Sequence, residues 1–364
     1  MRLLVALLLL SSPVWGAFTR RWNLTPATSQ VVGGTHTGFA VLVDITHNDL
    51  KQTGGGGQVT NANGYDIAPS TDSTCATYDT DFQREMYDGS GGRIVMWWNV
   101  SLTQGNNYYL CAGNTAITTD VSAPTTTWNS AYLMRHGFGN GSSIPTADST
   151  SNGNNISSLG GFAANSGGQI YGAAAQGGTT HIDMNGSPLD GLTAFTIDGW
   201  IYNPSTANDV AFFSDWDSQT VLWRFSFSNS FRLILKWADA STTDFDPYTA
   251  TGHATNTWTK MSVTYDGTTV RVYTNGAQVA TASVSGKTMK SHTSTNTQNL
   301  GGGGTGTESY WRGSLDEFRV SNVARSADWL ATEFNAATPS TFWTTTGPDT
   351  LATNTRRRVQ VSIQ

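Results

Sequence analysis

Short apolar runs separated by glycine- and asparagine-rich turns dominate the first third of the chain. The clearest runs occupy residues 39–45, 93–100 and 107–111, and they are rich in β-branched and aromatic side chains. Such runs are typical of β-strands, and several short strands at this spacing favour a β-sandwich. The pattern therefore predicts an N-terminal β-sandwich domain over residues 17–127.

The same alternation of strands and turns continues over residues 128–336. Its clearest part is a pair of alternating runs, 261–265 and 269–273, on either side of Asp266-Gly267. Asp-Gly between two alternating runs is a strong signal for a β-hairpin. We therefore expect a second all-β domain, joined to the first by a junction at residues 128–144.

One segment near the C-terminus has helical spacing. Ser326 is a candidate N-cap, and Leu330 and Phe334 lie four residues apart, on one face of a helix. This pattern predicts a short helix over residues 326–334 that packs on the second domain. The remaining residues 337–364 are expected to form a tail.

The N-terminus has the pattern of an export signal. Arg2 precedes an apolar run at residues 3–10, Pro13 breaks the pattern after that run, and Gly16 and Ala17 are small. This order predicts a signal peptide over residues 1–16, with a buried first strand as the alternative. The run is too short to span a bilayer, so we expect a mature chain that is secreted or held on a surface and has no transmembrane segment.

Composition narrows the range of partners. Charged residues make up 13% of the chain, and the net charge is −6. Nucleic acid is therefore not expected as a partner, because phosphate binding needs clustered lysine and arginine. The chain has 13 Trp, 12 Tyr and 15 Phe, and so many rings in a low-charge β protein favour surfaces on which a ligand can stack.

Cys75 and Cys111 are the two cysteines of the chain. Export leads to an oxidising compartment, where an even count permits a disulfide. The bond would close a loop of 36 residues. In the chain-entropy model it would stabilise the fold by roughly 3–4 kcal/mol. Two separate buried thiols are the alternative.

Four segments of the second domain resemble the laminin-G-like, concanavalin A-like jelly roll. They are residues 198–201, 258–267, 272–276 and 313–321. The resemblance implies a jelly roll over residues 145–336, closed by its last strand and by the short helix.

The N-terminal part resembles domain of unknown function 2341, which often precedes such jelly rolls. The similar segments are residues 38–43, 64–67 and 108–114, although Cys111 and Ala112 stand where aromatic residues are expected. Together the two resemblances imply an all-β protein: an N-terminal β-sandwich followed by a concanavalin A-like (laminin-G-like) jelly roll with a short C-terminal helix. They also imply an exported, surface-associated module with glycan or protein ligands.

The acidic residues are poorly placed for cleaving a glycan. Glycoside hydrolysis needs two carboxyl groups roughly 5–9.5 Å apart that face one sugar. Asp316 and Glu317 are adjacent, so on a strand they should point to opposite faces. Asp244 and Asp246 have a suitable spacing, but Pro247 follows them and favours a loop. We therefore expect no enzyme, with a glycoside hydrolase or lyase of concanavalin A-like fold as the alternative.

Aromatic residues at loops and strand ends are the candidates for ligand binding. Lectin-like sites on jelly rolls use rings for the apolar faces of sugars and Asn, Asp or Gln for the hydroxyl groups. Asp215-Trp216-Asp217 is the most interesting cluster, because a ring stands between two carboxylates in a predicted loop. The other candidates are Trp223, Trp237, Tyr248 and Trp311, and burial in the core is the alternative for each ring.

A structural calcium ion is the metal that the sequence favours. The six histidines form neither an HxH nor an HExxH pattern, so no catalytic zinc is expected. Ca²⁺ takes about six to eight oxygen ligands. Asp148 opens the jelly roll and Asp316 lies in its predicted last strand. The two carboxylates could meet at one ion, unless Asp316 accepts backbone N–H bonds instead.

These observations lead to one interpretation and two alternatives. We expect a secreted or cell-surface adhesion protein, or one on a virion surface, that binds a glycan or glycoprotein surface through its jelly roll. The alternatives are a polysaccharide-degrading enzyme and a purely structural surface or virion protein.

Overall fold

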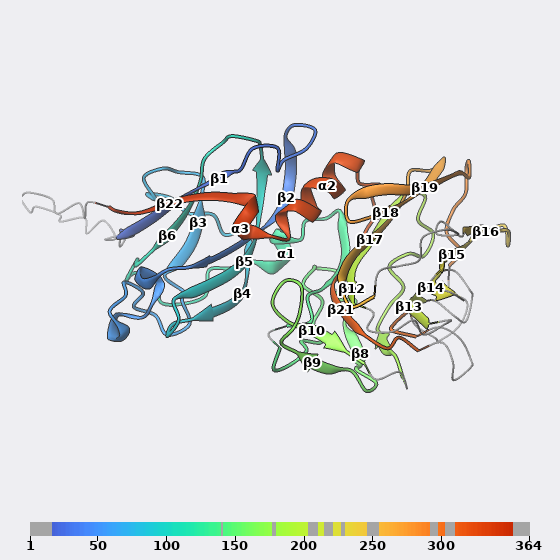
Figure 1. Ribbon diagram of the computed structural model, residues 1–364, viewed down its shortest axis with the longest axis horizontal. Helices are drawn as coiled ribbons and strands as arrows, with labels where there is room; N and C mark the ends of the chain where they lie inside the picture. Colours follow the sequence, from blue (N-terminus) through green and yellow to red (C-terminus); the bar gives the residue numbers. More distant parts are fainter. Residues whose placement is uncertain are drawn as a thin grey trace, which may run out of the picture.

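The computed structural model of the protein describes residues 17–139, 141–176, 180–202, 210–214, 221–226, 230–245, 255–291, 298–302 and 310–351. Two β-sandwiches lie one after the other along the long axis of the molecule, with a helix between them (Figure 1). The predicted all-β fold class is confirmed. Within the described residues, no helix is long and apolar enough to cross a membrane.

The N-terminal sandwich consists, in the described part of the chain, of a four-stranded and a three-stranded antiparallel sheet. Its core is aromatic, since Trp22, Phe39 and Trp98 are at most 1% exposed. Short helical turns lie at η1 (Asn48–Leu50), η2 (Thr53–Gly55) and α1 (Pro124–Thr127). The first sheet has the order β22 (Trp343–Thr350), β1 (Arg20–Pro26), β6 (Tyr108–Ala112), β3 (Ile67–Ser70), and the second the order β2 (His36–Thr46), β5 (Arg93–Leu102), β4 (Phe82–Asp88).

The predicted disulfide is confirmed. Cys75 is bonded to Cys111 of β6, and both residues are buried in the core of the N-terminal sandwich. The bond ties the loop that follows β3 to the strand with which β3 pairs.

The C-terminal segment completes the first sheet of the N-terminal sandwich. After α3 (Pro339–Phe342) the chain forms β22, which pairs antiparallel with β1 (Figure 1). Trp343 anchors this strand, because its indole Nε1 donates a hydrogen bond to the carbonyl oxygen of Leu42, 2.8 Å away. The prediction of a tail over residues 337–364 is therefore wrong as far as Thr350, since a threonine-rich strand lacks the apolar run that would reveal it.

The second sandwich is the jelly roll. In the part of the chain that the structure describes, one of its sheets has eight strands and the other seven. The predicted hairpin around Asp266-Gly267 joins β17 to β18. One strand, β7, lies in the predicted junction, so the sheet includes residues ahead of position 145. The larger sheet has the strand order β19 (Ala277–Ser283), β18 (Thr269–Thr274), β17 (Trp258–Tyr265), β12 (Phe195–Tyr202), β21 (Ser314–Ser321), β10 (Ala173–Ala175), β9 (Ala163–Asn165). An eighth strand of this sheet, β7 (Tyr132–His136), also pairs with β21. The smaller sheet has the strand order β16 (Thr242–Phe245), β15 (Ser230–Lys236), β14 (Val221–Ser226), β13 (Val210–Ser214), β20 (Asn299–Leu300), β11 (Ile182–Met184), β8 (Ile156–Ser158).

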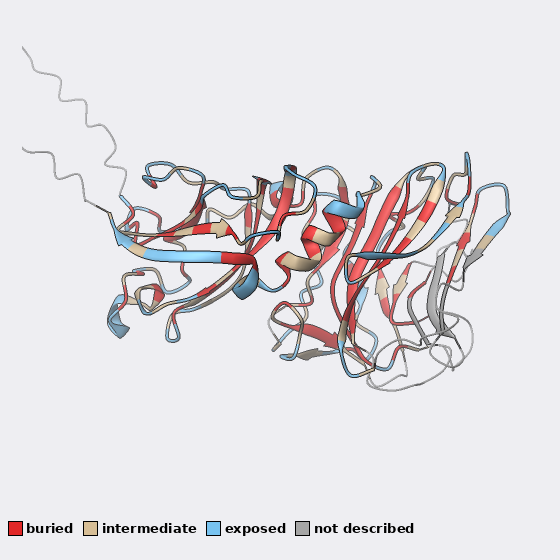
Figure 2. Ribbon diagram, turned by 45° about the horizontal axis from the view of Figure 1, so that its top comes forward, coloured by how far each residue is buried: buried red, intermediate tan, exposed pale blue. Residues whose placement is uncertain are grey.

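The predicted helix is α2 (Ala327–Ala336), and it contacts both domains. Ser326 caps it, because its side chain accepts a hydrogen bond from the backbone N–H of Trp329, 3.1 Å away. Trp329 and Leu330 belong to the apolar core of the N-terminal sandwich, whereas Glu333 reaches Lys260 in β17 of the jelly roll. The helix therefore lies between the two sandwiches rather than on the jelly roll alone (Figure 2).

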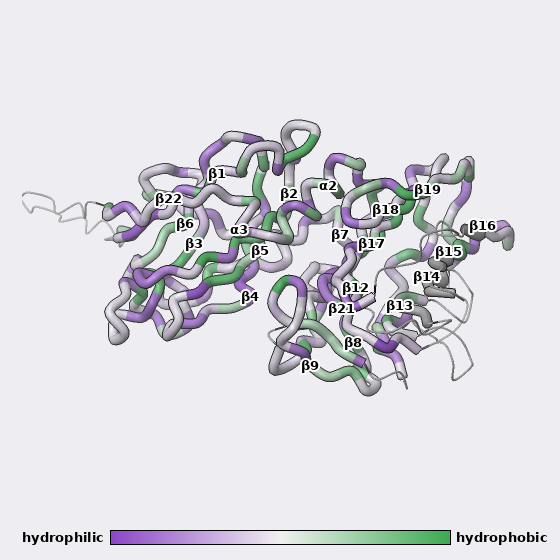
Figure 3. Tube along the Cα trace, in the orientation of Figure 1, coloured by the Kyte–Doolittle hydropathy of each residue, from purple (hydrophilic) through white to green (hydrophobic). Residues whose placement is uncertain are grey.

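Two strands of the second sheet of the N-terminal sandwich, β2 and β5, are buried on both faces. In β5, Ile94, Met96 and Trp98 lie in the core of the sandwich, while Val95 and Trp97 belong to an apolar cluster shared with the jelly roll. A strand with one face in water alternates apolar and polar residues, whereas a strand buried on both faces does not. The apolar stretch in β5 is therefore explained by the neighbouring domain (Figure 3).

We predict that Trp343→Ala destabilises the N-terminal sandwich. The change removes a buried indole and its hydrogen bond to Leu42, and changes of this kind lower the free energy of unfolding by about 3–5 kcal/mol. Urea-induced unfolding, followed by far-UV circular dichroism, measures the loss. Thr345→Ala is the control, because Thr345 is exposed on the same strand. If both variants unfold at the same urea concentration, β22 does not stabilise the sandwich as described.

Candidate functional site at the domain interface

The two sandwiches meet through a network of buried ion pairs. Arg135 on β7 pairs with Glu317 on β21 and with Glu85 on β4, the latter at 2.7 Å between Nη1 and Oε1. The side chains of Arg135 and Glu317 are 2% exposed, and that of Glu85 is 12% exposed. Because Glu85 belongs to the N-terminal sandwich and Glu317 to the jelly roll, one guanidinium group joins the two domains.

The network continues across the jelly roll to α2. Arg319 on β21 pairs with Glu317 at 2.9 Å and with Glu333 at 3.1 Å. Glu333 also pairs with Lys260 at 2.6 Å, and Lys260 lies 3.3 Å from Asp198 on β12. These five side chains are at most 5% exposed. Each charge has an opposite charge beside it, which is what burial of ionised groups requires.

Indole rings cover the guanidinium groups of this network. Those of Arg135 and Arg319 both lie 4.9 Å from the ring centroid of Trp128, and that of Arg319 lies 4.5 Å from the centroid of Trp97. Desolvated cation–π contacts of this kind contribute about 2 kcal/mol. Since Trp97 comes from β5 and Trp128 from the junction, these rings form a second connection between the domains.

Burial and ion pairing shift the pKa values of the buried carboxyl groups in opposite directions. Burial raises the pKa of Glu85 and of Asp316, and the charge of Glu317 adds to the effect. Burial would also raise the pKa of Glu317, but the guanidinium groups of Arg135 and Arg319 outweigh it and lower that pKa. The ionised form of Glu317 is therefore the one that stabilises the interface.

A β-bulge places Asp316 and Glu317 on the same side of their sheet. The residues from Asp316 to Arg319 on β21 oppose the shorter segment from Trp200 to Asp198 on β12, and Glu317 has a positive φ of 50° at this point. The prediction that the two acids point to opposite faces is therefore wrong, because the bulge adds a residue to one strand. Both acids are at most 2% exposed, so neither can touch a glycan in this structure.

The donors around Asp148 and Asp316 do not fit the predicted calcium site. Each carboxylate oxygen of Asp148 already accepts two hydrogen bonds, which come from three backbone N–H groups and one hydroxyl group. Asp316 accepts a bond from a backbone N–H, and its raised pKa favours the neutral acid, which is a poor calcium ligand. In the described residues, no group of three or more His, Cys, Asp or Glu side chains is arranged to hold a metal ion.

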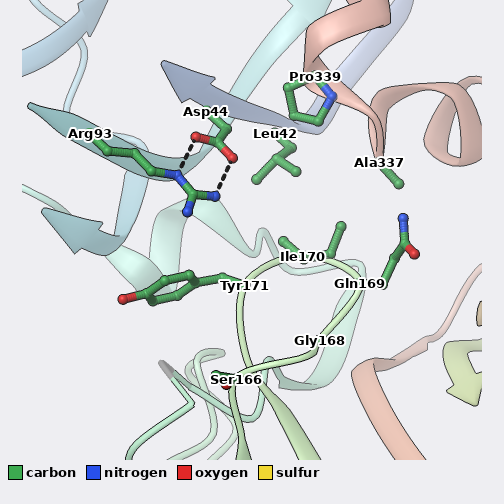
Figure 4. Close-up of a pocket in the computed structure, with 10 residues that line it drawn as sticks. All are labelled: Leu42, Asp44, Arg93, Ser166, Gly168, Gln169, Ile170, Tyr171, Ala337 and Pro339. Atoms are coloured by element: carbon green, nitrogen blue, oxygen red, sulfur yellow. Dashed lines mark hydrogen bonds and ion pairs between the residues drawn. The ribbon is translucent and has the colours of Figure 1, made fainter. Parts of the chain in front are cut away.

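A cleft of about 260 Å³ lies where the two domains face each other (Figure 4). One wall comes from β2 and β5, the opposite wall from the loop between β9 and β10, and residues after α2 contribute the rest. The polar lining residues are Asp44, Arg93, Ser166, Gln169 and Tyr171, and apolar atoms come from Leu42, Ile170, Ala337 and Pro339.

Arg93, Asp44 and Tyr171 give the cleft its chemistry. Arg93 donates two hydrogen bonds to Asp44, at 2.9 Å from Nε and 2.6 Å from Nη2, and these bonds raise the pKa of the arginine. Its guanidinium carbon lies 5.6 Å from the centroid of the Tyr171 ring. The side chains of Arg93 and Asp44 are 38% and 22% exposed, so both reach solvent. The two domains thus build one surface that is both polar and aromatic.

The two predicted ring residues whose side chains the structure describes, Trp237 and Trp311, do not line this cleft. Trp237 and Trp311 are fully buried in the jelly-roll core, so the alternative of burial holds for both. The indole Nε1 of Trp237 donates a hydrogen bond to the hydroxyl group of Thr243, 2.8 Å away. Asp215-Trp216-Asp217, Tyr248 and the side chain of Trp223 lie outside the described residues.

A second polar cluster lies on the jelly roll itself. His181 pairs with Asp183 of β11 at 2.9 Å between Nε2 and Oδ1, and its ring stacks on that of Tyr310 with 6.1 Å between the centroids. The side chains of His181 and Asp183 are 35% and 37% exposed. This cluster therefore also presents rings and a carboxylate to solvent.

Sequence reasoning missed Asp44, Arg93 and Tyr171 as a group. Arg93 begins a predicted strand and Tyr171 follows a glycine-rich segment, so neither is marked by its local sequence. The three residues come together only when both domains are folded. The signal that could have pointed to them is the apolar run in β5, which indicates that its sheet is covered on its second face.

Comparisons with known proteins agree with the fold of the second domain. Residues 176–331 match the family model Laminin_G_3, of the concanavalin A-like lectin/glucanases superfamily. No curated protein matches the chain.

Several solved structures are similar to part of this chain at low sequence identity. Domain 4 of AbnA, a GH43 extracellular arabinanase from Geobacillus stearothermophilus in complex with arabinotriose, is 17% identical over 55% of this chain and 96% of its own, with a TM-score of 0.45. The binding domain of Paraclostridial Mosquitocidal Protein 1 is 15% identical over 57% of this chain and 52% of its own, also at 0.45. The botulinum neurotoxin serotype D ligand binding domain, in complex with N-acetylneuraminic acid, is 12% identical over 58% of this chain and 52% of its own, with a TM-score of 0.41.

We predict that Glu317→Gln reduces the acid sensitivity of the fold. The pKa of Glu317 is lowered from its usual 4.5, so its ionised form stabilises the protein above that pH and the contribution is lost as the pH falls below it. Thermal unfolding at pH values from about 6 down to 3 should show a shallower fall in Tm for the variant than for the wild type.

Asp316→Asn is the control for this measurement. The pKa of Asp316 is raised, so its effect on stability has the opposite sign: stability is lost as the pH rises and the acid ionises. As the pH falls from about 6 to 3, the Tm of this variant should therefore fall at least as steeply as the Tm of the wild type. Parallel curves for the wild type and Glu317→Gln would show that Glu317 does not carry the acid dependence.

Proposed function

We propose that the protein is an exported adhesion protein that binds a carbohydrate in the interdomain cleft. The observation that carries the proposal is the meeting of the Tyr171 ring with the Arg93–Asp44 pair and the amide of Gln169 along one cleft. A sugar presents an apolar face that packs on an aromatic ring and hydroxyl groups that both donate and accept hydrogen bonds. The cleft supplies both kinds of partner, as small-molecule sites generally do.

The charges of the cleft favour a neutral sugar. Arg93 and Asp44 form a bidentate pair, so the positive charge that would attract an acidic sugar is already compensated. The free hydrogen-bonding capacity of such a pair still suits hydroxyl groups. Binding should therefore depend little on salt concentration, since screening acts on net charge.

The volume of the cleft limits the length of the ligand. At about 260 Å³ it lies just below the range of roughly 300–1,000 Å³ that is common for small-molecule sites. One or two sugar units would fill it. This size suits recognition of the end of a glycan, or of a single branch on a glycoprotein surface.

Binding is favoured over hydrolysis by the distribution of carboxylates. Among the described residues that line the cleft, Asp44 is the only acid, whereas hydrolysis of a glycosidic bond requires two. Export is supported by the Cys75–Cys111 disulfide, because such bonds persist in oxidising compartments. The predicted signal peptide at residues 1–16 lies outside the described residues and remains part of the proposal.

Tyr171→Ala should weaken glycan binding about tenfold, because it removes the ring on which the sugar stacks. Tyr171→Phe keeps the ring and should bind as the wild type does. A glycan array of the whole protein identifies the ligand, and isothermal titration with that glycan measures the affinities.

Tyr109 offers a matched control. The guanidinium group of Arg21 lies 5.4 Å from its ring and pairs with Asp349, so the same three residue types meet there. This group does not line the cleft, and Tyr109→Ala should leave binding unchanged. Loss of binding in His181→Ala but not in Tyr171→Ala would place the site on the second polar cluster and contradict the proposal for the cleft.

A further inference from the structure

Three buried side chains of the ion network have the arrangement of a small reaction centre. The ammonium group of Lys260 lies 3.3 Å from Asp198 Oδ1 and 2.6 Å from Glu333 Oε2. The side chains are 3%, 4% and 5% exposed. They come from β17, β12 and α2, so an amine and two carboxyl groups meet where water has little access.

We propose that Lys260 and Asp198 condense to form an intramolecular amide bond between neighbouring strands of the jelly roll, with Glu333 as the proton carrier. The proposal is independent of the ligand of the cleft. It makes this cluster a site of covalent modification that the protein carries out on itself.

The reaction balances without any other reagent. Glu333 takes a proton from the ammonium group of Lys260, and the free lone pair of Nζ attacks Cγ of the protonated Asp198. The C–N bond forms, and the hydroxyl group of Asp198 leaves with a proton that Glu333 returns. Nζ then releases its second proton to solvent, which offsets the proton that Asp198 had taken from solvent to become the neutral acid. The products are one amide and one water molecule.

The surroundings of the two acids fit these different roles. Burial raises the pKa of Asp198 to about 6, so its neutral form, which is the electrophile, is populated near neutral pH. Burial would also raise the pKa of Glu333, but the charges of Lys260 and Arg319 lower it to about 2. Glu333 is therefore an ionised carboxylate beside the amine, as a proton acceptor must be.

Condensation also relieves a cost of the network. An ion pair held away from water has lost its hydration, and its mutual attraction offsets this loss only in part. The amide removes one positive and one negative charge, so the balance among the remaining charges is unchanged. The bond would fasten β12 to β17 on the face of the jelly roll that carries the other domain.

The mass of the full-length protein tests this directly. The wild type should be lighter than its sequence by one water molecule, in addition to the two hydrogens lost in the disulfide. Lys260→Arg keeps the positive charge but lacks the amine, and Asp198→Ala lacks the acceptor, so both should have the full mass. Glu333→Gln should slow the reaction by about 10²-fold, which leaves freshly purified protein at full mass.

Peptide mapping of the wild type locates the bond and does not depend on the folding of any variant. Trypsin does not cleave after an acylated lysine, so the bond between Lys260 and Met261 should stay intact, in a fragment joined to the segment with Asp198. The exposed pair of Lys287 and Asp239 is the internal control, and trypsin should cleave after Lys287. Full mass and cleavage after Lys260 in the wild type would overturn the proposal, as would loss of water in Lys260→Arg.

Discussion

The structure depends on the burial of charged side chains between two domains. The face of β12, β17 and β21 that points away from the jelly-roll core carries polar residues, as a face in water would, yet these strands are almost entirely buried. Charges that have lost their water must find partners, and a guanidinium group pairs with carboxylates in a narrow geometry. Arg135 therefore fixes the position of Glu85 relative to Glu317. Because these two residues belong to different domains, the same contacts fix one sandwich relative to the other.

The interdomain cleft depends on this fixed geometry. A site whose walls come from two domains loses affinity if the domains must first be ordered by the ligand, because that ordering costs free energy. Ile170 connects the two features, since its backbone N–H donates a hydrogen bond to Asp316 and the residue also lines the cleft. Asp316, next to Glu317 of the ion network, thus holds the jelly-roll wall of the cleft in place, while Asp44 holds Arg93 in the other wall.

Local patterns predicted the fold well and the site poorly. Apolar runs, the Asp266-Gly267 turn and the Ser326 cap each specify an element through neighbours in sequence, and those elements are present. The strand β22 has no such run, because its exposed threonines need no core, and the bulge at Glu317 depends on tertiary pairing rather than on a glycine. Arg93 and Tyr171 meet across a domain boundary, which no local pattern records.

The dependence between the two sandwiches is unequal. Separation would expose Leu42 and Trp97 on the N-terminal sandwich and Trp200 on the jelly roll, because all three belong to one shared apolar cluster. The N-terminal sandwich also takes Trp329 and Trp343 into its core from the far end of the chain. Its core is therefore complete only when α2 and β22, from the end of the chain, are packed against it. The cleft takes one wall from each sandwich, so it exists only while the two sandwiches are in contact.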